Sequence, residues 1–259
     1  MKSAVYVISV DDESGKKRLH NFFTNVRSKL NCNVNVFKAK RHFRGGTYGC
    51  WESHVKVLSH AYTSGLDQVL IFEDDAITST LFCNETFSKL ITSINQLPKD
   101  WDLVGVGGIS LCWSNAPRKV SKYFYQTPFL ELHSYVASRK FMKIALDMEY
   151  DGQVDYAFAR KASTTSYLSS TEFFTQDDRM GSHNALQRFI IPLRAGFKAV
   201  NRHLMKLEFK IRNLLFLTIF IFSMVKSTKN RVGFIVLFFL LVLFDSVLDT
   251  SFAFRRDYI

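Results

Sequence analysis

Three consecutive carboxylates, Glu73, Asp74 and Asp75, directly follow the mostly apolar run QVLIF at 68–72. The run contains β-branched residues and predicts a buried strand, so the acidic side chains stand at its carboxyl end. Carboxylates packed this closely repel one another unless a cation or arginine side chains neutralise them, and hard divalent ions prefer oxygen ligands. The triplet therefore predicts a metal site that also binds diphosphate oxygens. Its spacing alone leaves open a solvated acidic turn.

Strand and helix patterns alternate through the first two-thirds of the chain. Short apolar runs predict strands at 4–10, 34–39, 68–72, 102–106, 132–138 and 166–174. Helical periodicity predicts helices at 17–30, 49–63, 85–97, 139–148 and 154–161. This order predicts an α/β fold with a mostly parallel sheet flanked by helices. Ligands of such sheets bind at the carboxyl ends of strands, where the acidic triplet stands.

The end of the chain has a different composition. Residues 213–225 and 232–244 carry no charged side chain, and a basic turn separates them. A helix needs roughly 20 apolar residues to cross a hydrocarbon core, so the first segment is short and the second is marginal. Because both are apolar on every side, they predict membrane association through 213–248, with two core helices of a soluble domain as the alternative. The predicted division is into a catalytic domain and a basic linker with a hydrophobic tail, at 1–205 and 206–259.

The 259 residues carry a formal net charge of +11, which favours anionic partners such as a phosphorylated small molecule, an acidic membrane or nucleic acid. The aromatic residues gather in apolar runs and do not alternate with Lys and Arg, which argues against nucleic acid. The first residues meet acidic side chains too soon for a signal peptide, so we expect a cytosolic domain. The cysteines have no C-x-x-C spacing, and we expect them to be reduced and mostly buried: Cys32, Cys50, Cys83 and Cys112.

Several short motifs occur in a fixed order along the chain. They are YVISV followed by basic residues at 16–18, G-x-x-G-C-x-x-S-H at 46–54, VLIFEDDA at 69–76, WDLVGVGG at 101–108, LHSYVASRKF at 132–141, QVD at 153–155 and FTQ at 174–176. Their order and spacing resemble those of glycosyltransferase family 25, the lipopolysaccharide and collagen galactosyltransferase group. Two positions depart from that pattern: Thr47 stands where the family has Glu, and the family's Pro-x-Asp is here Gln153-Val154-Asp155.

The resemblance implies a GT-A type nucleotide-diphospho-sugar transferase that acts with inversion and uses Mn²⁺ or Mg²⁺. In this chain it implies that Glu73, Asp74 and Asp75 hold the metal and the donor diphosphate. Asp155 is then the candidate general base for the acceptor hydroxyl, with a carboxylate that interacts with a helix dipole as the alternative. His133 is a candidate further metal ligand, with a packed core histidine as the alternative.

The remaining candidates concern the donor. Ser53 and His54 lie near the start of the predicted helix at 49–63, where backbone N–H groups could face phosphate or ribose oxygens; capping and packing is the alternative. Gln176 follows the last predicted strand and could contact donor or acceptor, or belong to an acidic surface turn. The other donor-binding candidates come from the opening motif and the acidic triplet: Ser9, Arg18 and Asp74.

Together these features predict a membrane-associated glycosyltransferase with its catalytic domain on the cytoplasmic side. We expect it to move a sugar, galactose in the first instance, from a UDP-sugar to a glycolipid or a lipopolysaccharide- or lipooligosaccharide-type acceptor. The alternative is a catalytically degenerate transferase fold that binds carbohydrate or serves as a scaffold at the membrane. The intact acidic triplet favours the enzyme, because a metal site without a function would be free to lose its charges.

Overall fold

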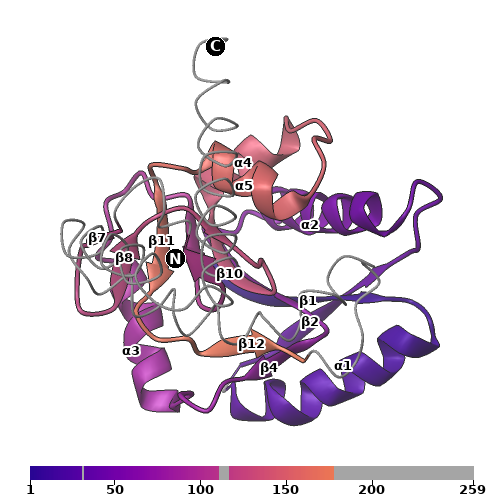
Figure 1. Cartoon of the computed structure of the whole chain (residues 1–259), viewed down its shortest axis with the longest axis horizontal. Helices are drawn as coiled ribbons and strands as arrows, with labels where there is room; N and C mark the ends of the chain where they lie inside the picture. The colour runs from indigo at the N-terminus through magenta and orange to yellow at the C-terminus, as the bar shows by residue number, and fades with distance from the viewer. Residues whose placement is uncertain (31, 111–116, 178–259) are drawn as a thin grey trace, which may run out of the picture.

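The computed structural model describes residues 1–30, 32–110 and 117–177, which form a helix layer, a central sheet and a second helix layer (Figure 1). The sheet has eight strands, which in spatial order are β2 (Val34–Ala39), β1 (Ser3–Val10), β3 (Gln68–Glu73), β10 (Ser134–Ser138), β5 (Leu103–Gly105), β11 (Ser166–Ser169), β8 (Phe124–Gln126) and β7 (Arg118–Lys119). One face is covered by α2 (Gly46–Thr63), α4 (Arg139–Leu146) and α5 (Val154–Lys161). The other face is covered by α1 (Glu13–Asn25) and α3 (Asn84–Ile94).

Strand β3 is buried on both faces and links the two hydrophobic cores. Its side chains alternate, so that Ile71 packs in the core under α2, α4 and α5, whereas Phe72 packs in the core over α1 and α3. β3 pairs in parallel with β1 and antiparallel with β10. The carboxyl ends of β1 and β3 therefore meet the start of β10 at one edge of the sheet.

Two small antiparallel sheets extend this edge. β12 (Phe174–Gln176) pairs with β4 (Ala76–Thr78), and the register places Gln176 opposite Ala76. The backbone N–H of Asp177 donates to the carbonyl oxygen of Asp75 at 2.7 Å. This pairing carries the end of β12 over the acidic triplet. The second pair consists of β6 (Ile109–Ser110) and β9 (Phe129–Leu130).

The first turn of α1 packs directly on the end of β1. The helix begins after Asp12, whose carboxylate accepts a hydrogen bond from the N–H of Gly15 at 2.8 Å. This bond holds the pKa of Asp12 well below its usual range. A Cβ atom at Gly15 would stand 1.8 Å from the carbonyl oxygen of Val10, so the close approach requires glycine. As a result, Arg18 in the next turn is buried beside the sheet edge.

The predicted strands and helices occur in the predicted order, although the short strands β4 and β6 to β9 were not predicted. The expectation of a mostly parallel sheet is wrong: β10 runs antiparallel to both β3 and β5, and β8 runs antiparallel to both β11 and β7. The predicted single strand at 166–174 is wrong. β11 ends at Ser169, whose hydroxyl donates to the carbonyl oxygen of Thr171 at 2.6 Å, and the chain turns there before β12 begins. The predicted helix start near residue 49 is also wrong, because Gly45, with φ 97°, allows α2 to begin at Gly46.

The expectation that the cysteines are mostly buried is wrong for the described ones. Cys32 and Cys83 are exposed, because each lies in a connection at the surface, and Cys50 is half-buried on α2; all three are free thiols. Cys112 lies outside the described residues.

No helix within the described ranges is long and apolar enough to span a membrane. The predicted membrane segment at 213–248 lies outside those ranges, as does the predicted boundary between 205 and 206.

Candidate active site

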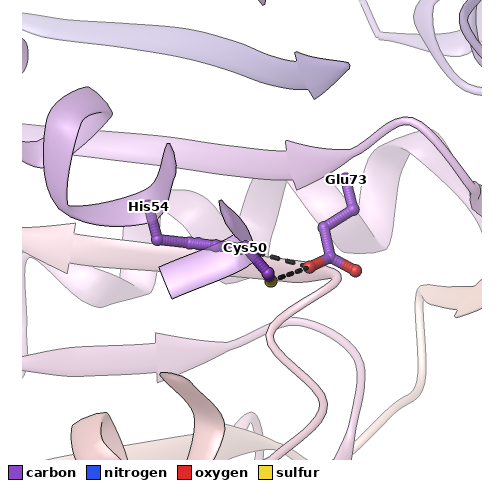
Figure 2. Close-up of side chains that lie close together, drawn as sticks. All are labelled: Cys50, His54 and Glu73. Atoms are coloured by element: carbon purple, nitrogen blue, oxygen red, sulfur yellow. Dashed lines mark hydrogen bonds and ion pairs between the residues drawn. The ribbon is translucent and has the colours of Figure 1, made fainter. Parts of the chain in front are cut away.

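Glu73 accepts hydrogen bonds from side chains of two other elements. Its Oε1 atom lies 3.1 Å from His54 Nε2 and 3.7 Å from Cys50 Sγ, both on α2 (Figure 2). Its Oε2 atom accepts from the amide of Gln176 on β12 at 3.2 Å. Burial raises the pKa of Glu73, but the hydrogen bond from His54 and the nearby imidazoles outweigh it and hold the pKa below its usual range. Glu73 is therefore an ionised carboxylate whose orientation is fixed by the Cys50 thiol, the His54 imidazole and the Gln176 amide.

The imidazole of His54 is held from its other side by Tyr135 on β10. The Tyr135 hydroxyl lies 2.9 Å from His54 Nδ1, and the two rings stack with centroids 5.7 Å apart. Cys50 and His54 are four residues apart, so they project from one face of α2 toward the end of β3. α2 and β10 together thus fix the orientation of Glu73.

The expectation that Ser53 and His54 lie near a helix start is wrong. α2 begins at Gly46, so the backbone N–H groups of both residues lie inside the helix. The Ser53 hydroxyl donates to the carbonyl oxygen of Gly49 at 2.6 Å, one turn earlier. Contact of Ser53 and His54 with a donor stays a prediction, and it now depends on their side chains.

Asp74 is buried and meets a cation. Arg18 Nε lies 2.9 Å from its Oδ1, and the Ser9 hydroxyl donates to its Oδ2 at 2.7 Å. Only 5% of Asp74 is exposed, which excludes the solvated acidic turn for this residue. Burial raises the pKa of Asp74 to about 6, with Glu73 adding to the rise and Arg18 and Ser9 opposing it. Three of the predicted donor-binding residues, Ser9, Arg18 and Asp74, therefore form one contact group.

Asp75 has a different environment from its neighbour. Its carboxylate accepts from the neutral amide of Gln176, 3.2 Å from Oδ2. Burial, followed by the charges of Glu73 and Asp74, raises its pKa to about 8. Of the three carboxylates, Asp75 would be stabilised most by a bound divalent cation. The ion would offset the repulsion from Glu73 and Asp74, which exceeds the attraction of Arg18 at this position. The carboxylate oxygens of Asp75 thus fit Mn²⁺ or Mg²⁺, whereas both oxygens of Asp74 already meet Arg18 and Ser9.

Asp155 lies in the first turn of α5, apart from the triplet. Its Oδ2 accepts from the backbone N–H of Glu131 at 2.8 Å. Glu131 has φ 69°, the left-handed region that side chains rarely adopt, and this conformation turns its N–H toward α5. Burial and the charge of Glu73 raise the pKa of Asp155 to about 6. At neutral pH it is mostly ionised and still able to accept a proton.

His133 is fully buried at the start of β10. Its Nε2 atom lies 3.2 Å from the carbonyl oxygen of Phe174. A Cβ atom at Gly107 would stand 2.4 Å from this nitrogen, so glycine is required for the imidazole to fit. The backbone of His133 also anchors the triplet, because its carbonyl oxygen accepts from the N–H of Glu73 at 3.0 Å. Its role as a metal ligand stays a prediction.

Three residues of the site were not among the predicted ones. Cys50 stands four residues before His54 in the G-x-x-G-C-x-x-S-H motif, so helical spacing was a signal that placed it on the same face. Tyr135 and Glu131 carried no comparable signal. Their contacts with His54 and Asp155 depend on the packing of β10 and on the backbone before it.

Comparison with protein families gives one match over most of the described chain. The sequence profile of glycosyltransferase family 25, described as a lipopolysaccharide biosynthesis protein, matches residues 3–172. Comparison with curated protein sequences gives no match.

Comparison with solved structures gives matches that share little sequence with this chain and have TM-scores below 0.5. A Drosophila β-1,4-galactosyltransferase 7 mutant in complex with manganese, UDP-Gal and xylobiose is 11% identical, with a TM-score of 0.41 over 73% of this chain and 74% of that one. A UDP-glucose pyrophosphorylase complexed with UDP-glucose is 10% identical, with a TM-score of 0.40 over 76% and 81%. A mannose-1-phosphate geranyltransferase from Thermus thermophilus is 9% identical, with a TM-score of 0.41 over 70% and 77%.

Proposed function

Because the chain belongs to glycosyltransferase family 25, we propose that it transfers a hexose, galactose in the first instance, from a UDP-sugar to a hydroxyl group of a glycolipid or lipopolysaccharide-type acceptor, with inversion. The observation that carries this proposal is the arrangement of acidic groups at one sheet edge. Asp74 is neutralised by Arg18, Asp75 is not, and Asp155 stands on a separate helix. Metal binding, donor binding and proton transfer thus have separate candidate groups.

Asp75 is the residue that would hold Mn²⁺ or Mg²⁺, beside Asp74, whose two carboxylate oxygens already meet Arg18 and Ser9. When bound, such an ion stabilises the charge that develops on a departing diphosphate. Arg18 fixes Asp74 from the α1 side, and Glu73 is fixed from the α2 side by His54 and Cys50. The protein thus supplies a site whose charges are oriented before the substrate arrives.

Asp155 is the proposed general base. Inverting transfer needs one group that removes the proton of the acceptor hydroxyl as its oxygen attacks the anomeric carbon, while the bond from that carbon to the diphosphate breaks. A pKa of about 6 leaves Asp155 mostly ionised at pH 7. Because this pKa lies near the working pH, the carboxylate also has enough affinity for a proton to accept it from the hydroxyl. The N–H of Glu131 holds one carboxylate oxygen and leaves the other for the hydroxyl.

The alternative is a carbohydrate-binding or scaffolding protein with a degenerate site. A binding protein has no need of a half-buried acidic group such as Asp75, whose ionisation its surroundings oppose. The chain nevertheless keeps it beside Glu73 and Asp74, and this favours the enzyme.

A nucleotide-sugar panel tests the proposed function. The full-length protein is assayed for UDP release and sugar transfer with Mn²⁺, and again with a chelator. We expect turnover of a UDP-hexose that needs the metal and is lost in Asp75→Asn. Asp147→Asn, an exposed carboxylate at the end of α4, is the matched control and should keep full activity. Turnover that survives both the chelator and Asp75→Asn would contradict the metal role.

We further propose that residues 213–248 attach the enzyme to a membrane, with the catalytic domain on the cytoplasmic side. Support comes from two uncharged, uniformly apolar segments with basic residues around them. Membrane fractions of cells that express the full chain should retain the protein after washing with high salt. In sealed right-side-out vesicles, the catalytic domain should be protected from added protease. A protein that is released by the salt wash, or digested in intact vesicles, would overturn this proposal.

A further inference from the structure

Three side chains with different ligand atoms converge between α2 and the end of β3. The Sγ atom of Cys50, a ring nitrogen of His54 and a carboxylate oxygen of Glu73 all lie within 4.8 Å of one another. Figure 2 shows the two α2 side chains directed toward the carboxylate. This set contains one soft, one intermediate and one hard donor.

The spacing of these atoms fits a single ion. In a tetrahedral zinc site the metal lies about 2.0 Å from nitrogen and oxygen and about 2.3 Å from sulfur, which separates neighbouring ligand atoms by about 3.3 to 3.6 Å. Glu73 Oε1 lies 3.1 Å from His54 Nε2 and 3.7 Å from Cys50 Sγ. The Cys50 Sγ atom and a ring nitrogen of His54 lie within 4.8 Å of each other, so all three donor atoms are close enough to converge on one ion.

The surroundings of the three donors also suit a metal. Metal-binding histidines usually donate their second ring N–H to a neighbouring group, which leaves the other nitrogen for the ion. Tyr135 offers that partner, because its hydroxyl lies 2.9 Å from His54 Nδ1. Gln176 donates to Oε2 of Glu73 at 3.2 Å and leaves Oε1 directed to Cys50 and His54.

We propose that Cys50, His54 and Glu73 form a binding site for Zn²⁺. Thiolate and imidazole ligands favour Zn²⁺ over Mn²⁺ and Mg²⁺, which prefer oxygen. Binding releases the Cys50 thiol proton to solvent as the sulfur–zinc bond forms; the nitrogen of His54 that binds the ion gives up its proton, and the neutral imidazole then carries one on Nδ1, facing Tyr135. With three protein ligands, the fourth position stays open to water or to a substrate oxygen. The inference rests on these three donors and does not depend on the transferase proposal.

Cobalt titration of the full-length, metal-free protein tests this site. Co²⁺ replaces Zn²⁺ in such sites, and a cysteine thiolate bound to it gives a charge-transfer band in the near ultraviolet. We expect the band to saturate at one Co²⁺ per chain, to disappear when Zn²⁺ is added, and to be absent in Cys50→Ser. The matched control is Cys83→Ser, which removes an exposed free thiol and should leave the band unchanged. Asp75→Asn should also keep it.

The inference is overturned if the wild type shows no band, or if the band persists in Cys50→Ser. It is also overturned if the band is lost in Cys83→Ser. Circular dichroism of Cys50→Ser shows whether the variant is folded; if it is not, His54→Gln replaces it in the same titration, with loss of the band expected. An enzyme that turns over a nucleotide sugar but gives no cobalt band would refute the zinc site and leave the proposed function standing.

Discussion

The two aspartates of the acidic triplet are adjacent in sequence and differ in almost every contact. On the α1 side, Asp74 meets the guanidinium of Arg18 and the hydroxyl of Ser9. On the β12 side, Asp75 meets the neutral amide of Gln176, and its pKa is raised to about 8. The charge of Asp74 is balanced within the folded protein by Arg18. Asp75 retains an affinity for a cation from solution, so the same residue type serves packing at one position and binding at the next.

The largest expected effect concerns the third acidic region, Asp155 on α5. Asp155→Asn removes the proposed base, and kcat for sugar transfer should fall by roughly 10³-fold. Because its pKa is raised to about 6, the wild-type rate should also decline as the pH falls below about 6, since a protonated carboxyl accepts no proton. A pH series of kcat/KM for wild type and variant measures both.

The control for this prediction is Glu149→Gln, an exposed acidic residue before α5. It should change neither the rate nor the pH profile. If Asp155→Asn keeps its rate, or loses UDP binding together with transfer, Asp155 is not the base.

The next effect concerns the buried ion pair between Arg18 on α1 and Asp74. Arg18→Met leaves Asp74 buried without its cation, and the free energy of unfolding should fall by about 3 kcal/mol, as is usual when one partner of a buried ion pair is removed. Chemical denaturation measures the change. Lys17→Met, the exposed neighbour on the same helix, should alter stability by less than about 0.5 kcal/mol. If both variants lowered the free energy of unfolding equally, the buried ion pair would contribute no more to stability than an exposed lysine.

The smallest effect has the opposite sign. Burial and the charges of Glu73 and Asp74 raise the pKa of Asp75 to about 8, so at pH 7 this carboxyl must take up a proton when the chain folds. Asp75→Asn removes that cost, and the metal-free protein should become more stable at pH 7 by about 1 kcal/mol or more. Asp74→Asn should instead destabilise it, because Arg18 then loses its partner. Thermal unfolding in the presence of a chelator compares the two. Destabilisation by both variants to the same extent would remove the distinction between the two aspartates.

The sequence was sufficient for the order of the longer strands and helices and for the acidic triplet, but not for the short strands β4 and β6 to β9. A β-branched run that ends in three carboxylates places them at a strand end, and this depends only on local pattern. The partners of the triplet depend on tertiary packing. The contact of Arg18 with Asp74 needs the close approach that Gly15 permits, and the position of Gln176 needs the short pairing of β12 with β4.

Two errors have a physical origin in local chemistry. The strand predicted at 166–174 breaks because the Ser169 hydroxyl bonds to the backbone two residues later, an interaction that apolar periodicity does not reveal. The sequence pattern predicts the start of α2 too late, because a basic, glycine-bearing stretch is typical of a loop, whereas here Gly45 is the N-cap and the helix begins at Gly46. That shift moved Ser53 and His54 from the helix terminus to its interior.

The most direct test of the central claim is calorimetric titration of the full-length protein with UDP. Wild type and the control Asp147→Asn should bind UDP in the presence of Mn²⁺ and lose most of that affinity in a chelator. Asp75→Asn should bind UDP equally weakly in both conditions, because the carboxylate that attracts the cation is gone. UDP binding that is equally strong with Mn²⁺ and with chelator in the wild type would contradict the account.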